Sequence, residues 1–133
     1  MIEVLILFLG VFLGAMGYLV ATFWMSPILR YHDVRHEVTA DIIYYRNAIS
    51  PTPDNAEMQQ RYDARRGANR KHAAELAACY QRLPWWYKKL LKYRHEEPMN
   101  AVPMLIGLSN VSREEDAEPR ISLLKKYLCI NDY

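Results

Sequence analysis

The stretch from Val4 to Met25 reads VLILFLGVFLGAMGYLVATFWM and carries no charged side chain. As an α-helix, its 22 residues would span about 33 Å, at about 1.5 Å per residue. The hydrocarbon core of a bilayer is about 30 Å thick, so length and composition together predict a transmembrane helix. Phe23 and Trp24 lie at its downstream end, where amphipathic rings favour the headgroup layer.

A cleaved secretory signal is the alternative interpretation of this stretch. Such a signal has a basic n-region and an apolar core of about 7–15 residues. Here the segment before the apolar run, Met1-Ile2-Glu3, contains an acidic side chain and no basic one. The apolar run of 22 residues is also longer than the core of a signal. We therefore predict a retained anchor in residues 1–26, followed by a single domain in residues 27–133.

The charges that flank the apolar run predict its orientation. Glu3 lies upstream, whereas Arg30, Arg35 and Arg46 lie downstream. Under the positive-inside rule, the chain is a single-pass protein of the cell membrane with its N-terminus outside and its C-terminal domain in the cytoplasm.

Small residues recur on one face of the predicted span. Gly10, Gly14, Gly17 and Ala21 follow one another at spacings of 4, 3 and 4, and the first two form a G-x-x-x-G pair. Such a stripe allows two helix backbones to approach closely. It predicts association of the span with a second copy or with another membrane protein, although glycine is also common in transmembrane helices generally.

The remainder of the chain has helical periodicity and no alternating strand pattern, so we expect an all-α domain built as a small helical hairpin or bundle. Prolines and polar clusters divide it, and Ser112 to Pro119 is acidic and reads as a loop. The predicted helices cover Pro27–Ile49, Thr52–Leu83, a short helix or turn at Pro84–Arg94, Pro98–Asn110 and Pro119–Cys129.

Two short segments carry a family resemblance. Asp41-Ile42-Ile43-Tyr44-Tyr45-Arg46-Asn47-Ala48 and Leu105-Ile106-Gly107-Leu108-Ser109-Asn110 resemble segments of small, uncharacterised bacterial proteins with one N-terminal span and a helical cytoplasmic tail. The resemblance implies the same layout. It implies no activity, because none is assigned to that group.

The segment with the most catalytic character is His32-Asp33-Val34-Arg35-His36-Glu37. His32 and His36 are four residues apart and share a helix face, so they are the candidate metal ligands. The zinc-protease pattern places Glu directly after the first His, and here that position is Asp33. We therefore favour a polar juxtamembrane helix and predict no bound cofactor.

Two further groups of residues suggest surfaces. The stretch from Trp85 to Arg94 combines aromatic rings with cations, which is typical of a membrane interface, although the rings could instead fill the core. The second helix carries a basic face that could contact lipid, a protein partner or only solvent; nucleic acid is the less favoured partner. The interface residues are Trp85, Trp86, Lys88, Lys89 and Lys92, and the basic face comprises Arg61, Arg65, Arg66, Arg70 and Lys71.

No glycine-rich phosphate loop, nucleophile elbow or Cys-His set is present, so we predict no catalytic residue and identify no small-molecule substrate. The favoured hypothesis is a membrane-tethered helical interaction or scaffold module that associates through its span. One alternative is a small membrane-active, toxin-like effector. The other is a metal-dependent enzyme that uses His32 and His36.

Overall fold

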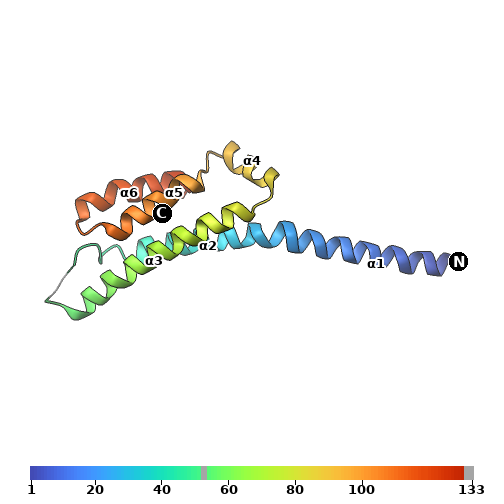
Figure 1. Cartoon of the computed structure of the whole chain (residues 1–133), viewed down its shortest axis with the longest axis horizontal. Coiled ribbons are helices and arrows are strands. Elements are labelled where there is room, and N and C mark those ends of the chain that lie inside the picture. Colours follow the sequence, from blue (N-terminus) through green and yellow to red (C-terminus); the bar gives the residue numbers. More distant parts are fainter. Residues whose placement is uncertain (52–53, 131–133) are drawn as a thin grey trace.

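The computed structural model describes residues 1–51 and 54–130. It contains α-helices and one π-helical turn, with no strand in those residues, which confirms the all-α prediction. A long N-terminal helix projects from a compact bundle, and the other helices lie beside its C-terminal half (Figure 1).

The projecting helix is continuous from Ile2 to Tyr44. It consists of α1 (Ile2–Val20), the π-helical turn η1 (Ala21–Met25) and α2 (Ser26–Tyr44). In a regular α-helix, the ring of Pro27 would clash with the carbonyl of Phe23, four residues earlier. The wider π turn directly before α2 accommodates the proline without breaking the helix.

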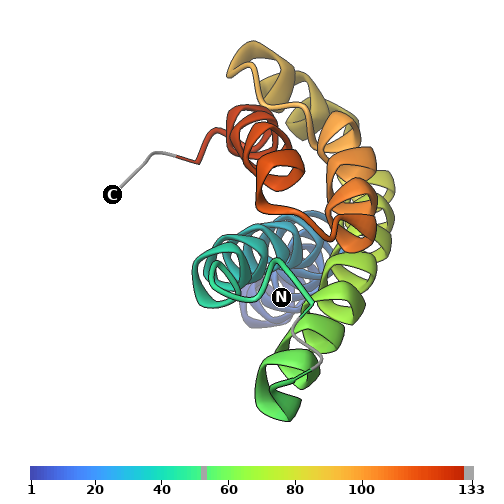
Figure 2. The same ribbon diagram turned by 90° about the vertical axis from the view of Figure 1, so that its left-hand side faces the viewer.

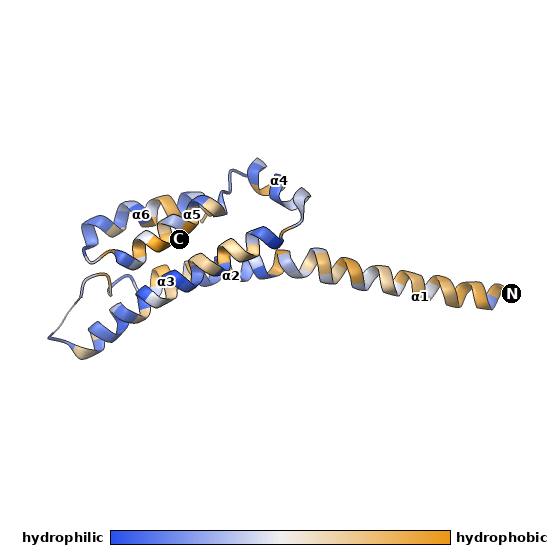
Figure 3. Ribbon diagram, in the orientation of Figure 1, coloured by the Kyte–Doolittle hydropathy of each residue, from blue (hydrophilic) through white to orange (hydrophobic). Residues whose placement is uncertain are grey.

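No side chain of α1 or η1 is buried against the rest of the chain. Figure 3 shows that this segment is mostly hydrophobic, whereas the bundle helices mix hydrophobic and hydrophilic residues. Among the described residues, this is the one helix long and apolar enough to cross a membrane.

α2 ends at Tyr44, five residues before the predicted end at Ile49. The chain turns at Tyr45, whose carbonyl accepts a hydrogen bond from the amide of Ala48 at 2.9 Å. This turn brings Ala48 and Ile49 into the core, where both are buried. A helix continued to Ile49 would carry those two side chains past the bundle.

α3 extends from Ala56 to Arg82 and is the longest helix of the bundle. Thr52 and Pro53, where the sequence predicts its start, lie outside the described residues. The helix is capped by Asn55, whose side chain accepts hydrogen bonds from the amides of Glu57 and Met58. Such a cap satisfies main-chain donors that have no partner within the first turn.

Three shorter helices complete the bundle: α4 (Trp85–Tyr93), α5 (Pro98–Asn110) and α6 (Glu114–Tyr127). The prediction of an acidic loop from Ser112 to Pro119 is wrong, because α6 begins at Glu114. Its first turn contains Glu114, Glu115 and Asp116, and negative charge there favours the helix dipole. Ala117, in the next turn, is fully buried.

α3 packs against both α2 and α5, and α6 packs against α5. Figure 2 shows these four helices from the end of the bundle. Both cysteines are free. The core is formed by apolar side chains from every bundle helix, among them Tyr31, Val34, Leu76, Leu91, Leu105, Leu108, Leu124 and Leu128.

Candidate membrane-interface site

α4 is a short amphipathic helix at the end of the bundle from which α1 projects (Figure 1). It begins directly after Pro84, and it buries Tyr87 and Leu91, which are four residues apart on one face. The opposite face is open: 71% of Trp85 and 84% of Tyr93 are exposed. Large aromatic side chains exposed together in this way can mark an interaction surface.

An aromatic contact joins α4 to the end of the apolar helix. The rings of Trp24 in η1 and Trp86 in α4 meet edge to face, with their centroids 6.4 Å apart. Trp86 also meets Tyr87 edge to face, at 5.6 Å. Trp85 and Trp86 therefore lie at the level at which α1 leaves the bundle, which their separation in the sequence does not reveal.

Lysines surround these rings. Lys89 Nζ lies 4.8 Å from the centre of the Trp85 ring, and Lys88 Nζ lies 5.3 Å from that of Tyr80. Lys88 also donates to the carbonyl of Gln81 at 3.1 Å. With Lys92 they line an open groove of about 360 Å³, whose lining also includes the acidic residues Glu96 and Glu97. The outer surface of α4 is therefore aromatic and cationic.

Behind α4, a buried polar cluster holds the bundle together. The Tyr31 hydroxyl donates to Glu96 Oε1, and Arg35 Nε lies 3.7 Å from the same oxygen. Burial, reinforced by the hydrogen bond to Glu96, raises the pKa of Tyr31 well above its usual range. Arg35 also donates to the carbonyl of Cys129 at 2.8 Å. The cluster thus ties α2 to the α4–α5 connection and to the end of α6.

The two candidate metal ligands have different surroundings. His32 Nε2 lies 2.8 Å from the hydroxyl of Tyr87 in α4, whereas His36 is exposed. Burial, followed by the nearby charge of Arg35, lowers the pKa of His32. In the described part of the chain, neither histidine belongs to a group of three potential ligands; the one such group is Glu37, His72 and Glu75.

The basic residues of α3 divide into two sets. Arg65, Arg66 and Arg70 bind the C-terminal end of α5 through its main-chain carbonyls and the side chains of Ser109 and Asn110. Arg61 pairs instead with Glu57 at 3.0 Å on the surface, and Lys71 is exposed. Cations at the C-terminal end of a helix favour its dipole and satisfy its last carbonyls.

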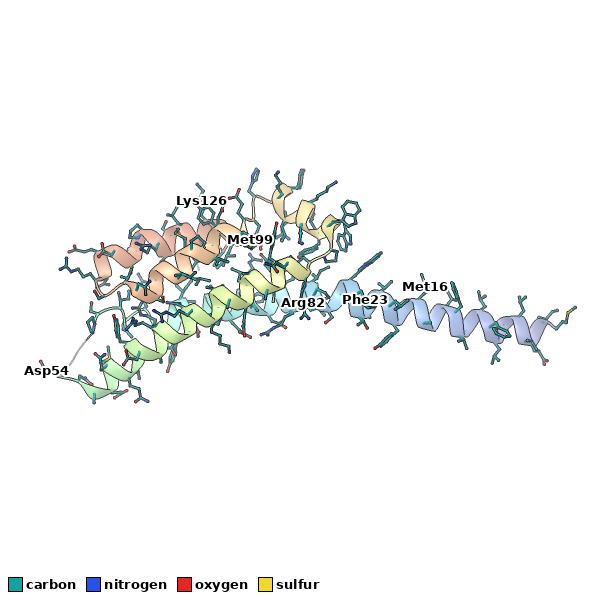
Figure 4. All side chains as sticks on the ribbon, in the orientation of Figure 1. Met16, Phe23, Asp54, Arg82, Met99 and Lys126 are labelled. Carbon is teal, nitrogen blue, oxygen red and sulfur yellow. The ribbon has the colours of Figure 1, made fainter. Side chains whose placement is uncertain are left out.

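The small-residue stripe of α1 faces no other part of the chain. At Gly10, Gly14 and Gly17, an added Cβ would meet no described atom within 4 Å. Figure 4 shows the side chains of α1, including the labelled Met16, standing free of the bundle, whereas Phe23 and Arg82 lie at the junction.

Sequence reasoning missed the link between η1 and α4 and the grouping of Glu37, His72 and Glu75. A signal for the second existed, because His72 and Glu75 are three residues apart in one predicted helix and Glu37 lies in the helix before it. Which turns of two helices face each other is set by tertiary packing, which periodicity alone does not define. Comparison with protein-family models, with curated proteins and with solved structures finds no significant match to this chain.

Proposed function

We propose that this protein is a membrane-anchored helical module, in which α1 crosses the bilayer and α4 holds the bundle against the same membrane surface. The observation that carries the proposal is the contact between Trp24 and Trp86, which sets the exposed rings and lysines of α4 level with the end of the apolar helix. Tryptophan rings favour the headgroup layer, and lysines beside them attract anionic lipid.

The dimensions support this arrangement. α1 and η1 contain 19 and 5 residues, so together they extend for about 36 Å, against a hydrocarbon core of about 30 Å. The bundle has its own core and uses none of these side chains. In the proposed arrangement, the bundle lies on the cytoplasmic face and its outer surface is free to bind a partner, while the glycine stripe mediates association of the spans.

The experiment measures the depth of single tryptophans in vesicles of brominated phosphatidylcholine that also contain anionic lipid. In the full chain, Trp24→Phe with Trp86→Phe leaves Trp85 as the one remaining tryptophan. We expect bromines near the headgroups to quench Trp85 strongly, and bromines deep in the acyl chains to quench it weakly.

Two controls use the same method. Trp85→Phe with Trp86→Phe leaves Trp24, which should be quenched because it lies at the end of the span. Replacing all three tryptophans by Phe and adding Gln60→Trp puts the fluorophore on an exposed site near the start of α3, at the opposite end of the bundle; it should not be quenched. If Trp85 were as insensitive as the fluorophore of the Gln60→Trp variant, the role of α4 would be overturned, and an insensitive Trp24 would overturn the anchor itself.

A further inference from the structure

Four polar side chains face one another across the α2–α3 pair. Glu37 and Asp41 are four residues apart on α2, and His72 and Glu75 are three residues apart on α3, so each pair shares one helix face. One donor atom from each of Glu37, His72 and Glu75 lies within 4.8 Å of the others. Both glutamates are partly exposed, so an ion from solvent can reach the group.

The two ring nitrogens of His72 are in different states. Its side chain is buried, with 4% of the residue exposed. Nε2 lies 2.7 Å from Asp41 Oδ2, whereas Nδ1 is buried and has no hydrogen-bond partner in the described residues. A metal-binding histidine typically has this arrangement: a carboxylate holds one nitrogen and thereby directs the lone pair of the other at the ion.

The carboxylates already attract positive charge. Arg30 reaches Glu37 at 3.4 Å and Glu75 at 3.3 Å, and Lys71 lies 3.9 Å from Glu75. These distances exceed the roughly 2.7–2.9 Å of strong charge-assisted hydrogen bonds. About half of the Arg30 side chain is exposed, so it can leave without disturbing the core. Arg30 contacts both carboxylates, but it leaves the Nδ1 atom of His72 without a partner in the described residues.

We propose that Glu37, Glu75 and the Nδ1 atom of His72 bind one divalent transition-metal ion, with Zn²⁺ as the best match, and that Asp41 orients the imidazole. One imidazole nitrogen and two carboxylate oxygens are donors that zinc accepts, and three protein ligands leave a fourth position for water. Calcium and magnesium prefer sites made of oxygen alone. The bound ion displaces Arg30 and links α2, which continues from the anchor, to α3.

The test is a titration of Zn²⁺ into the full chain, without an affinity tag, purified in nonionic detergent and stripped with a chelator. Calorimetry gives affinity and stoichiometry, and Co²⁺ as a substitute gives a visible ligand-field spectrum. We expect one equivalent to bind. His72→Gln and Glu75→Gln should weaken binding at least tenfold and remove the Co²⁺ bands, and Asp41→Asn should weaken binding roughly tenfold to a hundredfold.

The controls change residues of the same kinds on the same two helices. His36→Gln on α2 and Glu57→Gln on α3 alter exposed side chains and should leave affinity unchanged. Arg30→Gln removes the competing cation and should tighten binding. Glu75 and Asp41 are partly exposed, so their variants keep the test decisive if His72→Gln does not fold. Absence of binding, or binding that Glu75→Gln and Asp41→Asn leave intact, overturns the proposal, as does binding lost in His36→Gln.

Discussion

At Arg65, a charged guanidinium group enters the core and donates to three main-chain carbonyls. Nη2 binds the carbonyls of Val111 at 2.8 Å and Ile49 at 3.3 Å, and Nη1 binds that of Leu108 at 3.0 Å. Only 4% of the residue is exposed, and burial lowers the pKa of the guanidinium from its usual value. Arg65 therefore joins the segment after α2 to the end of α5.

We expect Arg65→Met to lower the free energy of unfolding by about 3 kcal/mol, because it leaves three buried carbonyls without donors at about 1–3 kcal/mol each, partly relieved by relaxation. Arg65→Lys should recover little, since an ammonium cannot reproduce the planar fork of donors. The measurement is chemical denaturation of the full chain in detergent. Arg61→Met, one turn earlier and on the surface, should cost less than about 1 kcal/mol; equal losses for the two variants would contradict this role of Arg65.

The surroundings of His32 predict how the stability of the bundle changes with pH. Its pKa in the folded chain is below the usual 6.5, owing first to burial and then to Arg35. In the unfolded chain the imidazole has its usual pKa of about 6.5, so it binds a proton at a higher pH than in the folded chain. The contribution of His32 to the stability of the fold is therefore complete above about pH 6.5, and it decreases as the pH falls below that value. We expect the melting temperature, measured with chelator present, to decrease from about pH 7.5 to about pH 5.5, where histidine titrates.

His32→Gln should reduce this decrease, because an amide can still bond to the Tyr87 hydroxyl but does not titrate. His36→Gln is the matched control, since it changes an exposed histidine one turn along the same helix. The argument fails if the two variants and the unmodified chain show the same pH dependence.

At the scale of the elements, local chemistry explains what the sequence could predict. α5 has the predicted bounds, Pro98 to Asn110, because a proline suits its first turn and Val111 leaves the helical region. The end of α2 and the start of α6 were mispredicted, because they depend on which side chains the bundle can bury: Ile49 in one case and Ala117 in the other. The predicted helix began at Pro119 because proline favours the first turn of a helix, but Pro119 lies inside α6.

The candidate sites follow the same division. The apolar run of α1 is a property of consecutive residues, so the sequence alone identifies it. Arg65 binds carbonyls that lie 43 and 46 residues later in the sequence, at Leu108 and Val111, and one that lies 16 residues earlier, at Ile49. Trp86 contacts Trp24, which is 62 residues away, and His72 contacts Asp41, which is 31 residues away. The sequence placed Arg65 on a basic face of α3, but it could not identify the carbonyls that Arg65 binds.

For α1, the testable feature is its glycine face. Gly14 lies in the middle of the stripe and has no described neighbour within 4 Å of an added Cβ, so Gly14→Ile should fit within the isolated chain. Between two spans it would prevent close approach, and helix-pair contacts of this type contribute about 1–2 kcal/mol. We expect association to weaken roughly tenfold, since about 1.4 kcal/mol corresponds to a tenfold change.

Crosslinking in membranes, or energy transfer between labelled copies, measures this association. Phe12→Ile introduces the same side chain on the opposite face of the helix and should leave association unchanged. The same dimer yield for Gly14→Ile and the unmodified chain would mean that the glycines do not form an association face.

At the scale of the whole molecule, the cations gather near the point where the apolar helix ends. Arg30 and Arg35 follow that helix in sequence, and the lysines of α4 join them through the contact between Trp24 and Trp86. Upstream, Glu3 is the one charged side chain before the apolar run. The fold therefore adds to the charge asymmetry that orients a span, and it does so with residues far along the chain.

This asymmetry predicts that the bundle lies in the cytoplasm. An alkaline phosphatase fused after Tyr133 should be inactive in bacterial cells, because that enzyme requires the periplasm, and a cytoplasmic fluorescent reporter at the same site should be bright. Adding positive charge upstream, with Ile2→Lys and Glu3→Lys, opposes the downstream cations and should move part of the population to the inverted orientation. Ile2→Ser with Glu3→Ser alters the same positions without added positive charge and should move less. Phosphatase activity from the unmodified chain would show that the orientation is the reverse of the predicted one. It would place α4 and its lysines at the periplasmic surface of the same membrane.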